Sequence, residues 1–198
     1  DGEPIKVSFQ FKPGSKPVRC RAPEYPQHSA RREFLEGWCE RSLASGLIAP
    51  AKGTRWAARV LTVAKYALNE SRLKQTPDAI RVVNDFSRTN EVLEKLTPTA
   101  PHTHLEMQKL AGKKWYWQAD AASAYWSFQL DAEAAESTSV WLPYRGRTRL
   151  FAFQRLPMGS KNSAAYMQSR YCEALSNQLN AEARASMASL ADDFVGYA

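Results

Sequence analysis

Apolar and polar residues alternate at the start of the chain and then recur at helical spacing. Between residues 5 and 11 every second side chain is apolar, a pattern typical of a strand. Four prolines between residues 13 and 26 predict an extended, turn-rich connection. From Ser29 onward the apolar residues fall on one side of a predicted helix, which Gly46 ends. Residues 47–50 close this part of the chain.

Two pairs of apolar segments predict two β-hairpins. Residues 56–66 and 79–86 are rich in Val, Leu and Thr, and the polar residues 67–78 between them predict an exposed tip. Further along, residues 137–142 and 149–155 flank a proline- and glycine-containing turn at 143–147. We expect each pair to be antiparallel.

The second half of the chain predicts two helices and the strands that lead to its acidic residues. Thr103, with Glu106 three residues later, forms a capping-box pattern before a helix that stops at Gly112. Ser163 could cap a second helix, whose apolar residues recur at helical spacing up to Leu179. A short buried strand at 115–119 is expected to lead into Asp120.

The C-terminal residues predict a third hairpin. Residues 187–190 and 194–195 are apolar and enclose Asp192 and Asp193 at the turn. Helices and strands do not alternate regularly along the chain, and we find no internal repeat. This order favours an antiparallel α+β fold over a doubly wound parallel sheet.

Charge and composition limit the classes of function. The net charge is +7, and residues 1–100 carry 17 Lys and Arg against 11 Asp and Glu, or +6, which leaves +1 for the rest. A basic half suits a polyanionic partner such as nucleic acid. The three cysteines, Cys20, Cys39 and Cys172, form no CxxC pair and are interpreted as ordinary thiols in a reducing compartment. No apolar run approaches the roughly 20 residues of a membrane span, so we expect a soluble intracellular protein.

Acidic residues within apolar segments are the strongest chemical signal. Asp192 and Asp193 are adjacent and follow Leu190 closely, and Asp120 comes after three aromatic residues. Neighbouring carboxylates in an apolar setting repel each other and lose hydration unless a cation or proton compensates. Hard oxygen ligands are those that Mg²⁺ takes. The sequence therefore predicts a magnesium centre that could clamp the two oxygens of a phosphoryl transfer.

Five motifs in order resemble those of the reverse transcriptases of LTR retrotransposons and retroviruses. Residues 118–130 resemble the first catalytic motif, and residues 156–163 followed by Gln168 resemble the segment that contains Met-Pro-Phe-Gly. Residues 190–193 match the YxDD box. Residues 81–90 and 45–50 match two motifs nearer the N-terminus. The matches cover nearly the whole chain at the expected spacing.

The resemblance implies a role for each matched residue. Asp120 and Asp192 would be the main ligands of two Mg²⁺ ions, which Mn²⁺ could replace, with Asp193 supporting the primer end. The backbone of Ala121 would join the metal site. Tyr125 would be a steric gate that excludes a 2′-hydroxyl from the incoming sugar.

The other implied contacts concern the nucleotide, the template and the primer. The nucleotide would contact the backbone at Ser123 and Ala124. Met158 and Gly159 would form a floor beneath it. Arg81 and Lys65 would contact its phosphates, and Lys74 is an alternative to Lys65. Template and primer contacts would come from Asp85, Arg145, Arg147, Lys161 and Gln168. Arg149 is a further candidate, and a solvated charged turn is the alternative interpretation of these arginines.

Two positions depart from the family's pattern. Met158 stands where Phe or Gln is common, and Leu190 replaces the aromatic residue of the YxDD box. Leu can neither donate a hydrogen bond nor stack, so primer positioning and fidelity are the properties that these departures affect. Metal binding is not affected because neither side chain is a ligand.

The resemblance also implies a right-hand polymerase architecture. Residues 1–94 and 128–162 would form the fingers, and residues 95–127 and 163–198 the palm, with an antiparallel sheet backed by helices and no thumb. The partners would be dNTPs, an RNA or DNA template with its primer, and the rest of a Pol polyprotein, including thumb and RNase H. We expect the protein in the cytoplasm or in a retroelement particle.

Three alternatives remain open from the sequence. An RNA-dependent RNA polymerase shares the two-metal palm, but Ala191 and the bulky Tyr125 favour DNA synthesis. An inactive or binding-only remnant of a retroelement is the second. A DNA-binding module is the third, although His102 and His104 have no nearby cysteine with which to make a zinc site.

Overall fold

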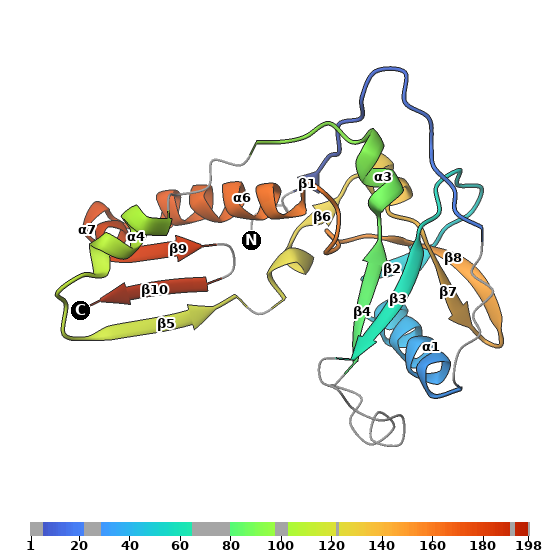
Figure 1. Cartoon of the computed structure of the whole chain (residues 1–198), viewed down its shortest axis with the longest axis horizontal. Helices are drawn as coiled ribbons and strands as arrows, with labels where there is room; N and C mark the ends of the chain where they lie inside the picture. The colour runs from blue at the N-terminus through green and yellow to red at the C-terminus, as the bar shows by residue number, and fades with distance from the viewer. Residues whose placement is uncertain are drawn as a thin grey trace. The chain divides into compact units, whose positions relative to one another are not determined.

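The computed structural model describes residues 6–21, 29–64, 80–97, 103–121, 123–190 and 193–197. The chain divides into two compact units. The first comprises residues 1–94 and 128–160, and the second comprises residues 95–127 and 161–198. Each contains helices and mainly antiparallel sheet, as expected for the α+β class (Figure 1).

The first unit is built on two antiparallel sheets. Strand β2 (Ile48–Pro50) pairs with β8 (Arg147–Phe153), which pairs with β7 (Val140–Tyr144). Strand β3 (Arg59–Ala64) and strand β4 (Ile80–Asp85) form the predicted hairpin, whose tip lies outside the described residues. A bridge between Ala58 and Val140 joins the two sheets.

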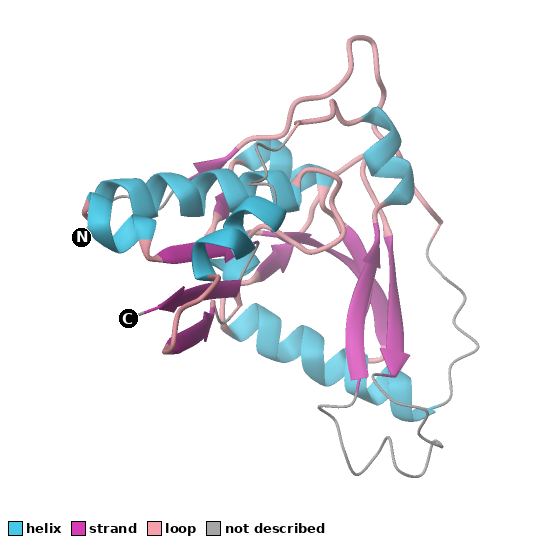
Figure 2. Cartoon of the chain, turned by 60° about the vertical axis from the view of Figure 1, so that its left-hand side comes forward, coloured by secondary structure: helices cyan, strands magenta, loops and turns pink. Residues whose placement is uncertain are grey.

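Helices and a short parallel pair complete this unit. Helix α1 (Ser29–Ala44) packs on β7 and β2 (Figure 2). Among its described residues, the other helices are α3 (Ser87–Val92) and α5 (Ala132–Ser137). Strand β1 (Lys6–Val7) runs parallel to β6 (Gln129–Leu130), so the sheet content of the unit is not wholly antiparallel. The observed strand β1 is shorter than the strand predicted at residues 5–11. Phe11 forms only an isolated bridge to Leu93.

The core of the first unit is aromatic and aliphatic. Phe86 and Phe153 pack edge to face with ring centroids 6.4 Å apart, and both are almost fully buried. Each such side chain stabilises the fold by about 1.5–3 kcal/mol relative to an exposed one. Phe86 follows β4 and Phe153 ends β8, so this contact ties the two sheets together at the end of the hairpin.

The second unit is a three-stranded antiparallel sheet with helices. Its strands are β5 (Tyr116–Asp120), β10 (Asp193–Tyr197) and β9 (Met187–Leu190), with β10 in the centre. Its helices are α4 (Thr103–Leu110), α6 (Ser163–Gln178), α7 (Ala181–Ala185) and the 3₁₀ helix η2 (Ala124–Ser127). The Tyr171 ring of α6 packs edge to face on Phe194 of β10, with centroids 5.8 Å apart. Figure 1 shows α6 running alongside the sheet.

Three sequence expectations about this architecture are wrong. Residues 115–119 are exposed rather than buried, because β5 is an edge strand and no described element covers Trp115. Residues 137–139 are not a strand, since Asp131 caps α5 by accepting from the Ala134 N–H at 2.8 Å. Helix α6 has Asn162 at its N-cap, and Ser163 is its first helical residue.

Candidate active site

Two of the three predicted acids occupy directly opposed positions on neighbouring strands. In the register of β5 and β10, Asp193 is the partner of Asp120. Directly opposed residues have their Cβ atoms about 4.5–5.5 Å apart, and like charges placed so are destabilising. The register therefore makes the two acidic residues neighbours on one face of the sheet.

The setting of these acids differs from the expected one. Asp120 and Asp193 are both exposed, so the prediction of carboxylates in an apolar, buried setting is wrong for them. Both lie at strand ends, where hydration remains. Asp192 lies outside the described residues, and among those described no three His, Cys, Asp or Glu side chains form a group that could hold a metal.

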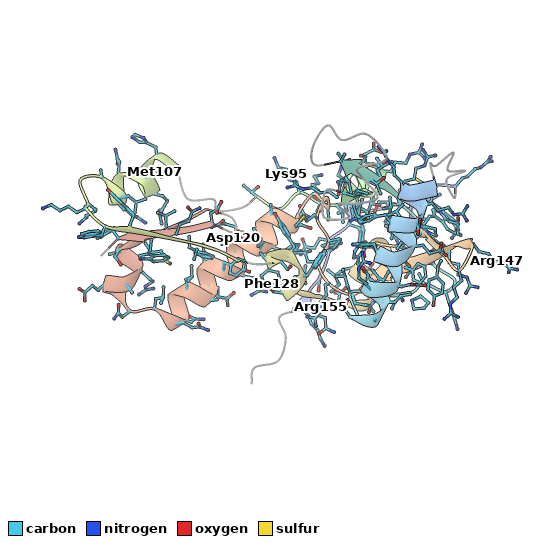
Figure 3. All side chains as sticks on the ribbon, turned by 90° about the horizontal axis from the view of Figure 1, so that it is seen from below. Lys95, Met107, Asp120, Phe128, Arg147 and Arg155 are labelled. Atoms are coloured by element: carbon cyan, nitrogen blue, oxygen red, sulfur yellow. The ribbon has the colours of Figure 1, made fainter. Side chains whose placement is uncertain are left out.

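The chain turns sharply after Asp120. Figure 3 shows this residue at the end of β5. Ser123 has φ of 56°, a left-handed conformation that is uncommon outside glycine and often marks functional sites. The Ala124 N–H donates to the Ala121 carbonyl at 3.2 Å, and the Trp126 N–H donates to the Ser123 carbonyl at 2.9 Å. The Ala124 amide is thus used within the turn, and a phosphate would have to share or replace that bond.

Tyr125 lies in the 3₁₀ helix that follows this turn. Its side chain is half-buried, and η2 packs against α6. Tyr125, which is five residues after Asp120 in the sequence, thus lies on a short helix that contacts α6. Ala124, beside it, is buried.

Arg81 and Asp85 lie on β4 in the first unit. Arg81 is exposed and pairs in register with Val63, while Lys65 and Lys74 lie outside the described residues. The Asp85 carboxylate accepts the Ser87 hydroxyl at 2.6 Å and the Ser87 backbone N–H at 3.2 Å. These two bonds hold the pKa of the Asp85 carboxyl below its ordinary value, and the nearby charges of Arg59 and Arg88 lower it further.

A turn at Met158 and Gly159 packs against the end of β4. Gly159 has φ of 96°, and a Cβ there would lie 3.0 Å from the Asn84 carbonyl oxygen, so any side chain at this position would be strained. Asn90 Nδ2 donates to the Gly159 carbonyl at 2.9 Å, and Asn84 Nδ2 donates to the Met158 carbonyl at 3.5 Å. The Met158 side chain is exposed. Sequence reasoning assigned no role to either asparagine, although Asn90 belongs to one of the matched motifs.

The β7–β8 turn carries the candidate template arginines. Arg145 and Gly146 both have positive φ, 50° and 73°, as a tight two-residue hairpin turn requires. The Gly146 N–H donates to Glu36 of α1 at 2.9 Å. The guanidinium groups of Arg145 and Arg149 lie 5.1 and 5.8 Å from the centroid of the Tyr144 ring. Figure 3 shows Arg147 at the outer end of this hairpin. The structure thus gathers three arginines around one anchored turn.

The two remaining candidates lie at and within α6. Lys161 is exposed just before the helix. Gln168 is buried, and its Nε2 donates to Cys172 Sγ at 3.2 Å. A direct contact between Gln168 and a template would require this side chain to leave its present position.

The aromatic edge of the sheet has a feature that sequence reasoning did not find. Trp117 and Gly196 are cross-strand partners, and a Cβ on Gly196 would lie only 2.2 Å from two carbons of the Trp117 ring. The indole therefore lies across Gly196, three pairs along the strands from Asp120 and Asp193. The only sequence signal was a glycine inside an apolar strand pattern, which often marks a close approach.

Candidate membrane spans are absent from the described helices. None of these helices is both long enough and apolar enough to cross a bilayer.

Comparison with known proteins relates the chain to viral polyproteins. The Gag-Pol polyproteins of woolly monkey sarcoma virus and koala retrovirus are each 26% identical to it over 160 residues, which are 79% of this chain and 9% of each polyprotein. The Pol polyprotein of feline endogenous virus ECE1 is 25% identical over 162 residues, or 80% of this chain and 14% of that polyprotein. The chain therefore spans only a small part of these relatives.

Comparison with solved structures supports the same fold. The crystal structure of a prototype foamy virus protease-reverse transcriptase mutant aligns with a TM-score of 0.72 at 19% identity. The alignment covers 96% of this chain and 23% of that one. A family model described as reverse transcriptase (RNA-dependent DNA polymerase) matches residues 67–198, about two thirds of the sequence. The chain belongs to the reverse transcriptase family.

Proposed function

We propose that this chain is the fingers and palm of an RNA-directed DNA polymerase, which adds dNTPs to the 3′-hydroxyl of a primer. The observation that carries the proposal is the register of β5 and β10, which sets Asp120 opposite Asp193. Membership of the reverse transcriptase family gives the reaction type. The boundaries of the two compact units lie within two residues of those expected for fingers and palm.

The described donors fit a divalent cation. Asp120 and Asp193 offer exposed carboxylate oxygens from two strand ends, and hard oxygen donors suit Mg²⁺ or Mn²⁺. The Ala121 carbonyl follows Asp120, and Asp192 precedes Asp193 in the sequence, so both belong to the proposed ligand set. When bound, two Mg²⁺ ions would lower the pKa of the primer 3′-hydroxyl and neutralise charge on the leaving pyrophosphate.

The residues after Asp120 would select the nucleotide. Ser123 has a left-handed backbone, and Tyr125 follows it on a short helix that contacts α6. We assign the Tyr125 ring to the face of the incoming sugar, where it would exclude a 2′-hydroxyl by its bulk. The backbone of Ser123 and Ala124 would approach the triphosphate.

Residues of the first unit would act as fingers. Arg81, exposed on β4, would pair with phosphates through its planar guanidinium, with Lys65 as a second cation. Met158 and Gly159 would form the floor under the nucleotide and the template base. The arginines of the β7–β8 turn would contact template phosphates, which position a nucleic acid without reading its sequence. Asp85, whose carboxylate is engaged with Ser87, would order this region near the template.

The proposal also includes the polyprotein to which the chain would belong. The relatives are Gag-Pol and Pol polyproteins, so we assign the chain to a Pol-type polyprotein whose other parts supply thumb and RNase H functions. Its work would take place in the cytoplasm or within a particle. Lys161, exposed before α6, would add a phosphate contact, and the buried Gln168 would support that helix.

Primer extension on an RNA template tests the proposal. The chain, alone and joined to the sequence that follows it in its gene, is supplied with dNTPs or with rNTPs, with and without Mg²⁺. We expect Mg²⁺-dependent dNTP addition that Asp192→Asn abolishes, and more rNTP addition by Tyr125→Val. Preference of the unaltered protein for rNTPs would assign it to RNA synthesis. Salt-sensitive RNA binding without nucleotide addition would assign it to binding alone.

A further inference from the structure

The Met158–Gly159 turn is held tightly against the end of β4. Its backbone approaches so closely that a Cβ on Gly159 would lie 3.0 Å from the Asn84 carbonyl oxygen and 3.7 Å from Phe86 Cδ2. Leu156, just before the turn, is fully buried and its N–H donates to the Phe128 carbonyl at 3.0 Å. A side chain at position 159 would strain the turn whatever its chemistry, because φ is 96°.

Two asparagine side chains donate hydrogen bonds of unequal length to the carbonyls of this turn. Asn90 Nδ2 reaches the Gly159 carbonyl at 2.9 Å, the usual length of an N–H···O bond. Asn84 Nδ2 reaches the Met158 carbonyl at 3.5 Å, the outer limit of such a bond, and the Asn84 Oδ1 is buried with no hydrogen-bond partner among the described residues. Asn90 is therefore the stronger of the two contacts.

The position of Asn90 is itself fixed by the start of α3. The Asn90 N–H donates to the Phe86 carbonyl at 2.7 Å, and Phe86 is 2% exposed. Ser87, the first residue of the helix, donates twice to the Asp85 carboxylate. A buried ring and a hydrogen-bonded turn thus hold the helix that presents the Asn90 amide, so the amide is preorganised before it meets Gly159.

We propose that Asn90 is a positioning residue, which fixes the Gly159 carbonyl and with it the floor formed by Met158 and Gly159. The part of this inference that concerns nucleotides rests on the proposed function. If Asn90 sets the floor, its loss weakens binding of the incoming nucleotide more than it slows the chemical step. The metal carboxylates, Asp120 and Asp193, are far from Asn90 in the sequence and make none of these bonds.

The first test follows the turn itself and needs no activity. Hydrogen exchange is measured on peptides covering residues 156–162 in the unaltered chain, in Asn90→Asp and in Asn90→Ala. We expect these peptides to exchange about 3- to 10-fold faster in the variants, the size expected when one neutral hydrogen bond is lost. Peptides from β7 and β8 should be unchanged. Unchanged exchange at 156–162, or a uniform increase throughout the unit, would overturn the inference.

The second test separates binding from chemistry in single-nucleotide addition. We expect Asn90→Ala to raise KM for dNTP about 3- to 10-fold with less than a twofold change in kcat. Asn90→Asp should raise KM further, because a carboxylate oxygen would face the Gly159 carbonyl oxygen. A fall in kcat at unchanged KM would refute the positioning role. Absence of addition by the unaltered protein would refute the proposed function instead, and the exchange test would still decide the inference.

Asn180→Asp is the matched control for both tests. The Asn180 side-chain oxygen accepts the Ala183 N–H at 2.8 Å as the N-cap of α7. A carboxylate keeps that acceptor, so the same chemical change leaves the cap in place. Asn84→Ala allows the two asparagines to be compared. The bond from Asn84 is 3.5 Å long, so this substitution should have a smaller effect on exchange and on KM than Asn90→Ala. An equal or larger effect of Asn84→Ala would contradict the assignment to Asn90.

Discussion

Substitution of Gly196 by alanine is expected to destabilise the sheet that carries the acidic pair. Trp117 lies across Gly196 in the register of β5 and β10, and a Cβ would approach its Cε2 and Cζ2 atoms to 2.2 Å. Carbon atoms in contact lie about 3.5–4.0 Å apart. Either the indole must swing outward or the two strands must move apart.

The size of the effect follows from what the indole covers. Trp117 is 43% exposed, so somewhat more than half of its surface is buried. Tryptophan buries about 150–250 Å² when it packs fully, so displacement exposes about 100 Å², worth about 2–3 kcal/mol. Alanine gains about 0.5–1 kcal/mol over glycine within a strand. We therefore expect Gly196→Ala to lower the free energy of unfolding by about 1–2 kcal/mol.

A double-mutant cycle with urea denaturation isolates the contact. Trp117→Val removes the ring and keeps a residue that favours strands. In that background, Gly196→Ala should be neutral or stabilise by up to about 1 kcal/mol, because the clash is gone. If Gly196→Ala stabilises the chain with Trp117 present, or has the same effect in both backgrounds, the reasoning about this contact is refuted.

Three further predictions concern hydrogen bonds and ionisation. The pKa of Asp85 is lowered in the folded chain, chiefly by Ser87, so its contribution to stability is present above the ordinary value of 3.8 and lost as pH falls through the folded value. In urea denaturation, the stability difference between the unaltered chain and Ser87→Ala should therefore be constant near neutral pH and shrink below pH 3.8; a difference independent of pH would contradict this cause. Burial raises the pKa of the Cys39 thiol from 9.0 to about 12, helped by the charges of Glu40 and Glu36. Iodoacetamide at pH 8.5 should thus modify Cys39 only after unfolding, as mass spectrometry would measure, and rapid modification in the folded chain would refute this. The fully buried Asn162 accepts the Leu96 N–H at 3.1 Å, so Asn162→Ala should cost about 1–3 kcal/mol in thermal denaturation, and an unchanged melting temperature would contradict that role.

The sequence predicted the long elements of the fold but not its short helices. Strands β3 and β4 are clear from their Val- and Thr-rich pattern, and α1 and α6 each extend over sixteen residues. Helices α3, α5 and α7 have only five or six residues each, too short for periodicity to define. A cap decides α5, because the Asp131 carboxylate fixes where it begins.

Sequence motifs singled out the acidic residues but did not predict their surroundings. The apolar composition before Asp120 suggested burial, yet composition does not show whether any element covers a strand, and β5 lies at a sheet edge. The opposition of Asp120 and Asp193 depends on a register that two separate segments set together. Likewise, the bond from Asn90 to Gly159 joins residues 69 positions apart, which no local pattern indicates.

Single-nucleotide addition by Asp120→Asn tests the central proposal most directly. Asparagine keeps the size of the side chain and removes its charge, so an RNA-primed or DNA-primed template in Mg²⁺ should show about a thousandfold slower dNTP addition, since metal-bound charge stabilisation is worth several kcal/mol. Asp131→Asn is the matched control, because an amide oxygen can still accept the Ala134 N–H that caps α5. We expect the control to retain the rate of the unaltered protein. If Asp120→Asn adds nucleotides as fast as that protein does, the acidic pair on β5 and β10 is not the catalytic centre.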